Sequence, residues 1–241
     1  LENAVIVESS NLTLNPTNSV RWQPTFTFNG DVIAKNNSQH QLFLEQKNNA
    51  NGKVIFNGSL KGFNTVDASA NLLVKNQMEV DRLLTRGDIS LQILGGGRID
   101  QEAELLNKAG IILGDNPESH FEIAGDLNTS MSDAYFQGHF KTHGRVISDN
   151  LFLMGNTVVD TSSNPMHIAG NIEQNQTAAN LQIEMGQAQL EIEGNMRVHD
   201  LSIASATSPH LRGEVWTHDL NLDVPFIAFY HDLIVMGKAN C

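Results

Sequence analysis

The chain has 241 residues, of which 40% are hydrophobic and 17% are charged, and its formal net charge is −12. Such an acidic chain repels the phosphates of nucleic acids and anionic lipid surfaces, and no cluster of Lys and Arg provides a local exception. No run of about 20 apolar residues is present, so we expect no membrane span within this chain. Cys241 is the single cysteine, which excludes an intrachain disulfide. Few strong helix formers and many Asn, Ser, Thr and Gly residues favour an all-β protein.

The first 24 residues hold two short alternating runs, Ala4 to Val7 and Leu12 to Leu14, which are ended by Pro16 and Pro24. An open sheet edge invites aggregation unless it is covered. We therefore predict that residues 1–24 form an N-terminal cap or entry strand.

From residue 25 onward, a short pattern recurs in which an apolar residue stands two positions before a glycine and usually another stands two positions after it. Apolar residues at every second position indicate a strand rather than a helix. The glycine indicates a tight corner or a bulge, where a Cβ would clash or φ is positive. The glycines of this pattern are Gly30, Gly58, Gly125, Gly138, Gly155, Gly170, Gly194 and Gly213.

A second pattern marks the other strands: Asn or Asp, then Leu, any residue and an aliphatic residue. Asn and Asp suit the corner before a strand, because they tolerate turn geometry and hydrogen-bond their own backbone. The pattern begins at Asn71, Asn150, Asn180, Asp200, Asp219 and Asp232.

Between 75 and 113 both patterns weaken, and we predict one irregular insertion there. Met78, Val80, Leu83 and Leu84 fit one side of a short helix, and 100–109 has a helix-like N-cap and a following glycine. Alternating apolar residues at 89–93 and 111–113 indicate strands instead, so we expect the insertion to be either a helix or a long loop within one solenoid. A domain boundary near residue 97 or 115 is the alternative. The last segment, 224–241, is strongly apolar and contains Pro225, which suits a C-terminal cap better than a central strand.

The two patterns combine into a repeated unit. The segment from Gly194 to Ile203 recurs nineteen residues later, from Gly213 to Leu222. We interpret each copy as one coil and predict an all-β, single-stranded β-solenoid, a right-handed β-helix, over 25–223, with capping segments at both ends.

Three His-Asp pairs are the sharpest candidates for chemistry: His199–Asp200, His218–Asp219 and His231–Asp232. On consecutive coils, the first two pairs would stack about 4.8 Å apart and offer imidazoles and carboxylates to a divalent metal. Repeated corner residues also form such ladders without any function, and this is the interpretation that we favour. We therefore predict no metal, no other cofactor and no catalytic residue, with His199, Asp200, His218 and Asp219 as the one candidate metal ladder.

A polysaccharide-cleaving β-helix would need paired carboxylates or a basic residue along a groove. The compact mixed cluster in this sequence consists of Lys141, His143, Arg145 and Asp149. Because these residues are spread along one connection, we interpret them as a solvated face. The Gly-x-Ser-x-Gly motif of a serine nucleophile is absent, and we expect no enzyme.

One stretch resembles known coils: Gly144, Val146, Asn150, Leu151, Leu153, Gly155 and Asn156, then Ile168, Gly170, Asn171 and Ile172. It is similar to bactofilin-like polymer-forming domains and to the β-helical ectodomains of pilin-like bacterial surface proteins. The resemblance covers 120–238 and implies a structural β-helix with ends available for stacking. Uneven coil lengths favour a discrete surface or periplasmic module instead.

The alternation also resembles the β-rich repeats of AsmA/TamB-type envelope proteins, in which an open β-groove carries lipid. The alternation alone does not separate an open groove from a closed core. Our preferred expectation is a non-enzymatic structural or adhesive module of a bacterial cell surface or envelope, with the periplasmic lipid-carrying groove and the glycan-active β-helix as alternatives. We expect the partners to be other protein subunits or surface glycans, and self-association of this chain into a homo-oligomer is one form that such an assembly could take. The scarcity of cysteine also fits a cytoplasmic location.

Overall fold

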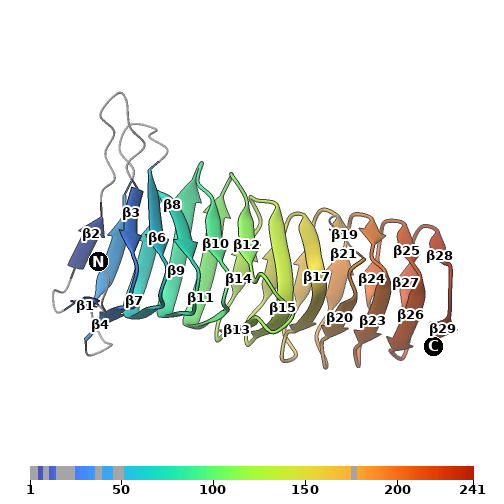
Figure 1. The fold of residues 1–241 in the computed structure, drawn as a ribbon. Helices are drawn as coiled ribbons and strands as arrows, with labels where there is room; N and C mark the ends of the chain where they lie inside the picture. The colour runs from blue at the N-terminus through green and yellow to red at the C-terminus, as the bar shows by residue number, and fades with distance from the viewer. Residues whose placement is uncertain (1–4, 8–10, 15–24, 36–39, 46–51, 175–177) are drawn as a thin grey trace.

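The computed structural model describes residues 5–7, 11–14, 25–35, 40–45, 52–174 and 178–241. This part of the chain contains 29 strands and no helix, and all strand pairs are parallel. The strands stack into one rod that runs from the blue N-terminal coil to the red C-terminal coil (Figure 1). The predicted all-β solenoid is therefore confirmed.

Each complete coil contributes one strand segment to each of three faces, and every segment pairs with the equivalent segment of the next coil. Face 1 consists of β1 (Val5–Val7), β4 (Val32–Ala34), the first parts of β7 (Leu60–Ala68), β9 (Met78–Gly87) and β11 (Gly97–Asn107), β13 (His120–Ile123), the second parts of β15 (Ala134–Thr142) and β17 (Leu151–Asp160), β20 (Leu181–Glu184), β23 (Asp200–Ala204), β26 (Asp219–Asp223) and β29 (Ala239–Asn240).

Face 2 follows face 1 along the chain. It consists of β2 (Asn11–Leu14), β5 (Gln41–Leu44), the second parts of β7, β9 and β11, β14 (Leu127–Thr129), β16 (Val146–Ser148), β18 (Met166–Ile168), β21 (Leu190–Ile192), β24 (His210–Leu211) and β27 (Ala228–Phe229).

Face 3 closes the coil. It consists of β3 (Thr25–Phe28), β6 (Lys53–Phe56), β8 (Asn71–Val74), β10 (Leu91–Ile93), β12 (Ile111–Leu113), the first parts of β15 and β17, β19 (Ile172–Gln174), β22 (Met196–Arg197), β25 (Val215–Thr217) and β28 (Leu233–Val235).

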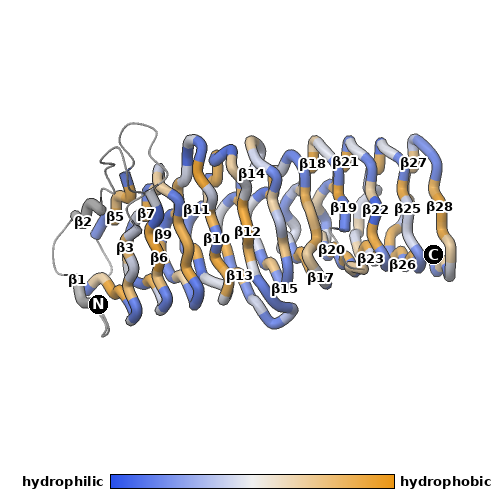
Figure 2. Tube along the Cα trace, turned by 45° about the horizontal axis from the view of Figure 1, so that its top comes forward, coloured by the Kyte–Doolittle hydropathy of each residue, from blue (hydrophilic) through white to orange (hydrophobic). Residues whose placement is uncertain are grey.

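The core lies inside the three faces and is built mainly from every second residue along the strands, as in β13 and β20. Val54, Leu91 and Ile183 are each 0% exposed, and buried phenylalanine rings stack between coils, as in Phe121 and Phe140 with centroids 5.0 Å apart. Figure 2 shows the same division along the chain, with hydrophobic segments in the strands and hydrophilic segments at many of the corners. The apolar residues fill a closed interior.

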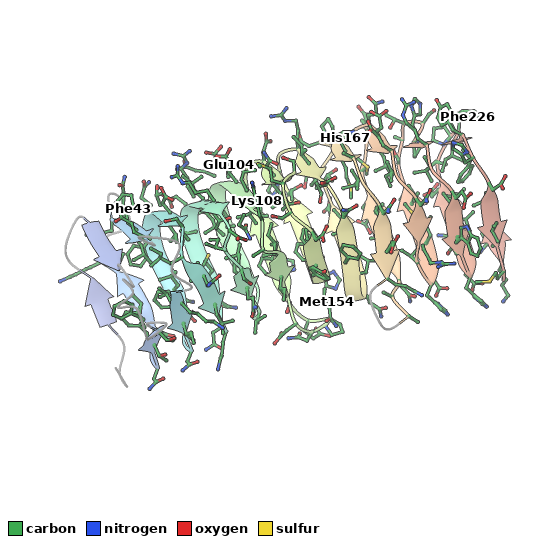
Figure 3. All side chains as sticks on the ribbon, turned by 90° about the horizontal axis from the view of Figure 1, so that it is seen from above. Phe43, Glu104, Lys108, Met154, His167 and Phe226 are labelled. Atoms are coloured by element: carbon green, nitrogen blue, oxygen red, sulfur yellow. The ribbon has the colours of Figure 1, made fainter. Side chains whose placement is uncertain are left out.

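Outward residues form rows along the rod, because parallel register repeats each position on every coil. Phe43, Glu104 and His167, which are labelled in Figure 3, lie in one such row on face 2. The corresponding row on face 1 alternates in charge over Lys61, Glu79, Arg98, Glu122, Lys141 and Asp160. Opposite charges on neighbouring strands stabilise a sheet.

The irregular insertion predicted in 75–113, a helix or a long loop, is wrong, because β9, β10, β11 and β12 fill this segment in register with their neighbours. Leu84, which we placed on the helix face, lies on the outward side of β9. The inward residues of β9 are Met78, Val80, Leu83 and Thr85, so the spacing changes from two to three at the corner. The pairing of β9 with β11 has a register shift at the same place. A strand that turns a corner through such an irregularity loses its period of two and imitates a helical spacing.

Residues at both ends also form strands. β1 and β2 pair with β4 and β5, which makes them entry strands, whereas 15–24 lie outside the described residues. In 224–241, where we predicted a cap, β27, β28 and β29 pair with the preceding coil on all three faces. This segment extends the solenoid instead of folding over its end.

The corner residues Asn150, Asn171 and Asn195, which we call the Asn ladder, bond across coils, not to their own backbone as we expected for corner Asn and Asp. Asn150 Oδ1 accepts the Asn171 N–H at 2.9 Å, Asn171 Oδ1 accepts the Asn195 N–H at 2.8 Å, and Asn195 Oδ1 accepts the Glu214 N–H at 2.9 Å. Each side chain therefore satisfies a backbone donor of the next coil at a point where the strands are interrupted.

Candidate functional site

The candidate site lies at the corner between face 3 and face 1 in the C-terminal coils. His218 N–H donates to the His199 carbonyl at 2.6 Å, and Asp200 of β23 pairs with Asp219 of β26. The repeated units therefore stack in register, as the sequence predicted. Thr217 is buried beneath the corner, and its Oγ1 lies 3.0 Å from the His199 carbonyl oxygen and 2.8 Å from that of Asp219. This buried hydroxyl fixes the backbone that carries both pairs.

The two histidine rings stack on each other with centroids 5.1 Å apart and planes inclined by 11°. His199 Nδ1 lies 2.9 Å from Asp200 Oδ1, and His218 Nδ1 lies 3.9 Å from that same oxygen. The ligand atoms of His199, Asp200 and His218 all lie within 4.8 Å of one another. The corner thus gathers two imidazoles and a carboxylate, which is chemistry suited to a divalent cation.

The two aspartates differ in their hydrogen bonds. Asp219 Oδ1 accepts the Lys238 backbone N–H at 2.8 Å and lies 3.1 Å from His218 Nδ1. The Lys238 hydrogen bond lowers the pKa of Asp219, against the opposing effect of burial, and the nearby His218 and Lys238 charges add to the lowering. Asp200 Oδ1 is inaccessible to solvent, and although His199 Nδ1 lies 2.9 Å away, this contact lacks the geometry of a hydrogen bond, so the oxygen has no hydrogen-bond partner among the described residues. Asp200 is therefore the unsatisfied member of the pair.

A groove of about 450 Å³ runs beside this corner across successive coils of face 1. Asp200 and Asp219 form part of its wall, and Gln182, Ser202 and Asn221 stand in one outward row along it. Asn221 Nδ2 donates to Ser202 Oγ at 3.2 Å. The remaining lining residues are Asn156, Thr157, Val158, Asn180, Leu181, Leu201, Leu220, Lys238 and Asn240. Amides and hydroxyls therefore share the lining with aliphatic residues.

Sequence reasoning missed the groove. The repeat did contain a signal, because Ser202 and Asn221 each stand two residues after a corner aspartate, at the outward position of a strand. Gln182 lies outside that repeat, and only the register of β20 with β23 places it in the same row.

The other sequence candidates are not brought together. His231 and Asp232 lie exposed at the start of β28 on face 3, away from the first two pairs. Lys141 belongs to the charged row of face 1, His143 Nε2 lies 3.4 Å from Glu122 Oε1, and Arg145 pairs with Asp126. These residues contact the preceding coil and do not form one cluster.

Comparisons with protein families, with curated proteins and with solved structures gave no match to this chain. Over the residues that the structure describes, no helix has the length and apolar character needed to cross a membrane. The site must therefore be interpreted from its own geometry.

Proposed function

We propose that this solenoid is a non-enzymatic binding module of a bacterial cell surface or envelope, and that it holds an extended, hydroxyl-rich ligand such as a linear glycan in the groove of face 1. The observation that carries the proposal is the row of Gln182, Ser202 and Asn221, which repeats polar groups along the rod on consecutive coils. Strands repeat about every 4.8 Å, so the groove offers donors and acceptors at regular intervals to a regularly spaced polymer.

The negative charge of the chain and of the groove limits which glycans can bind. The chain carries a net charge of −12, and Asp200 and Asp219 line the groove while Lys238 is its one lining cation. A strongly anionic polymer would be repelled by this surface. Neutral polysaccharides and polymers of amino sugars are the ligands that fit.

The alternative of a lipid-carrying groove has little support in the geometry. Such a groove would leave a row of inward apolar side chains open to a lipid chain. Along the C-terminal coils, Leu181, Ile183, Leu201 and Ile203 are 0 to 1% exposed, and they pack against one another inside the three faces. The groove in this region lies on the outside of the coils, and its lining mixes amides and hydroxyls with aliphatic residues instead of forming a continuous apolar row.

Affinity electrophoresis against a panel of neutral and amino-sugar polysaccharides tests the proposal. At least one polymer should retard the protein, and the double variant Gln182→Ala and Asn221→Ala should weaken that binding about tenfold or more, because two polar contacts of about 1 kcal/mol each are lost. The matched control is Gln92→Ala and Asn128→Ala, which makes the same changes on faces 3 and 2.

The control variant should bind as tightly as the unmodified chain. Equal loss in both double variants, or no retardation by any polymer, would contradict the groove proposal. Shortened polymer in the incubated samples, measured by mass spectrometry, would instead support the glycan-active alternative and overturn the non-enzymatic part.

A further inference from the structure

We propose that His199, Asp200 and His218 bind one divalent transition-metal ion, of the zinc, copper or nickel class, at the corner beside the groove. This inference is independent of the glycan proposal, because it rests on the corner side chains alone. The three residues come from two consecutive coils, so the site exists only when the repeated units are stacked.

The spacing of the ligand atoms fits a small ion. Zinc binds imidazole nitrogen and carboxylate oxygen at about 2.0 to 2.2 Å in tetrahedral geometry, which places neighbouring ligands about 3.3 Å apart. Asp200 Oδ1 lies 2.9 Å from His199 Nδ1 and 3.9 Å from His218 Nδ1. One distance is shorter and the other longer than this ligand spacing. The stacked rings do not share a plane, so one ring must turn to aim its nitrogen at the ion. The side chains of His199 and His218 are 43% and 49% exposed, which leaves room for that rotation.

The charges at the corner favour a cation. Asp200 and Asp219 stand opposite each other on neighbouring strands, where two like charges destabilise the pairing. Asp219 is compensated by the Lys238 backbone N–H, whereas Asp200 Oδ1 is shielded from water and accepts no hydrogen bond within the described chain. An ion at this point gives the orphaned oxygen a partner and separates the two carboxylates electrostatically.

The next coil leaves the corner uncovered. At the position that follows His218 in the stack, the chain has Gly237, whose N–H donates to the His218 carbonyl. A Cβ at Gly237 would lie 2.2 Å from Asp219 Oδ1 and 2.9 Å from His218 Nδ1. Any larger residue at position 237 would press on these two groups, and glycine leaves them accessible.

The donor set selects the class of metal. Two imidazole nitrogens with one carboxylate oxygen suit zinc, copper and nickel, whereas calcium and magnesium prefer sites made of oxygen alone. Solvent molecules would complete the coordination, because the corner faces the groove and the bulk water.

Isothermal titration of the full, tag-free chain with Zn²⁺ tests the site, and Co²⁺ absorption spectra report the coordination directly. We expect one ion per chain. His218→Ala and Asp200→Asn should each weaken binding about tenfold or more, as expected when a metal site loses one of its ligands or their support. The matched control is His139→Ala, because His139 pairs with His120 on two neighbouring strands of face 1, with ring centroids 6.3 Å apart and planes inclined by 35°, outside the His199 cluster.

A second variant tests whether weaker binding results from a change at the metal site or from misfolding of the chain. Gly237→Ala removes no ligand but places a methyl group against His218 and Asp219, and it should also weaken Zn²⁺ binding. Circular dichroism and Tm without metal establish that each variant is folded, and added Zn²⁺ should raise the Tm of the unmodified chain but not that of His218→Ala. Absence of saturable binding, or equal weakening by His139→Ala, overturns the proposal.

Discussion

The coils before residue 141 and the coils after it bury different side chains and turn their corners in different ways. The buried phenylalanines, namely Phe28, Phe56, Phe63, Phe121, Phe136 and Phe140, all lie in the first part, and the core of the second part consists of Leu, Ile, Val, Met and Ala. The first part contains β7, β9 and β11, which run through a corner from face 1 to face 2 without a break. In the second part, β20, β23 and β26 end at that corner, and the Asn ladder bonds consecutive coils between faces 2 and 3.

The difference has a functional consequence. Where a long strand continues through a corner, backbone pairing with the next coil continues with it, and the exposed side chains form ion pairs such as Arg82 with Glu102. Where the strand is interrupted, side chains must take over part of the hydrogen bonding. In the second part, asparagine side chains accept such bonds at successive corners, and the groove and the His-Asp corner lie among these coils.

The largest expected effect is on the aromatic core. Phe140 is 1% exposed and stacks with Phe121 and Phe136 at 5.0 and 4.4 Å between centroids. Phe140→Ala should lower the free energy of unfolding by about 3 to 5 kcal/mol, because the loss of buried area adds to the cost of a cavity. Urea unfolding followed by circular dichroism measures this loss.

The control for this truncation is Phe152→Ala, because Phe152 is an outward residue that stacks on Tyr135 at 5.0 Å. Its loss should cost about 1 kcal/mol, the value of one aromatic pair at a partly exposed site. If the two variants unfold at similar urea concentrations, burial in the core is not the main source of stability in the coils before residue 141, and the prediction is wrong.

Corner glycines should show a smaller effect, which depends on how closely the backbone of the neighbouring coil approaches each of them. A Cβ at Gly194 would lie 2.3 Å from the Gly170 carbonyl oxygen, so Gly194→Ala forces two coil backbones apart and should cost about 1 to 3 kcal/mol. Gly87, at the end of β9, has φ +89° and no atom within 4 Å of an added Cβ. Gly87→Ala should lower the free energy of unfolding by only about 1 kcal/mol, because the added side chain strains the backbone at positive φ. Tm values of both variants provide the comparison, and a milder effect at Gly194 would argue against close stacking of the corners.

The smallest effect concerns the corner ion pair of Arg145 and Asp126. Burial alone would raise the pKa of Asp126, but the side-chain and backbone hydrogen bonds from Arg145 outweigh it and hold that pKa below its ordinary value of 3.8. A lowered folded-state pKa adds stability above the unfolded value, and this contribution disappears as the pH falls through the folded value. Arg145→Gln should therefore destabilise the protein only slightly at pH 7, because the pair is exposed, and hardly at all well below pH 3.8.

Urea midpoints at both pH values, together with an NMR titration of the Asp126 carboxyl group, measure this effect. Lys108→Gln removes the same charge at a position that forms no ion pair within the described part of the chain. An unchanged titration of Asp126 in Arg145→Gln, or an equal pH response in the control, would contradict the assignment.

The solenoid and the stacking of its last coils could be predicted from the sequence. Apolar residues at every second position mark a strand in any context, and the nineteen-residue offset places Asp200 opposite Asp219, as the pairing of β23 with β26 confirms. The corner that each glycine occupies is visible only in the folded chain. Gly138 turns from face 3 to face 1 with φ +111°, whereas Gly194 turns from face 2 to face 3 beneath a neighbouring backbone, although both stand in the same sequence pattern.

The folded chain also shows that 75–113 consists of strands in register with their neighbours, and it shows which residues line the groove. The helical spacing of Met78, Val80 and Leu83 arises from an irregular corner, which only the pairing with neighbouring coils reveals. The groove joins Gln182 to Ser202 and Asn221 across coils of unequal length. Interstrand hydrogen bonds set this register, so the spacing of these residues in the sequence does not predict that they are neighbours. Local alternation specifies a strand, but its neighbours and its outward partners are fixed only when the coils stack.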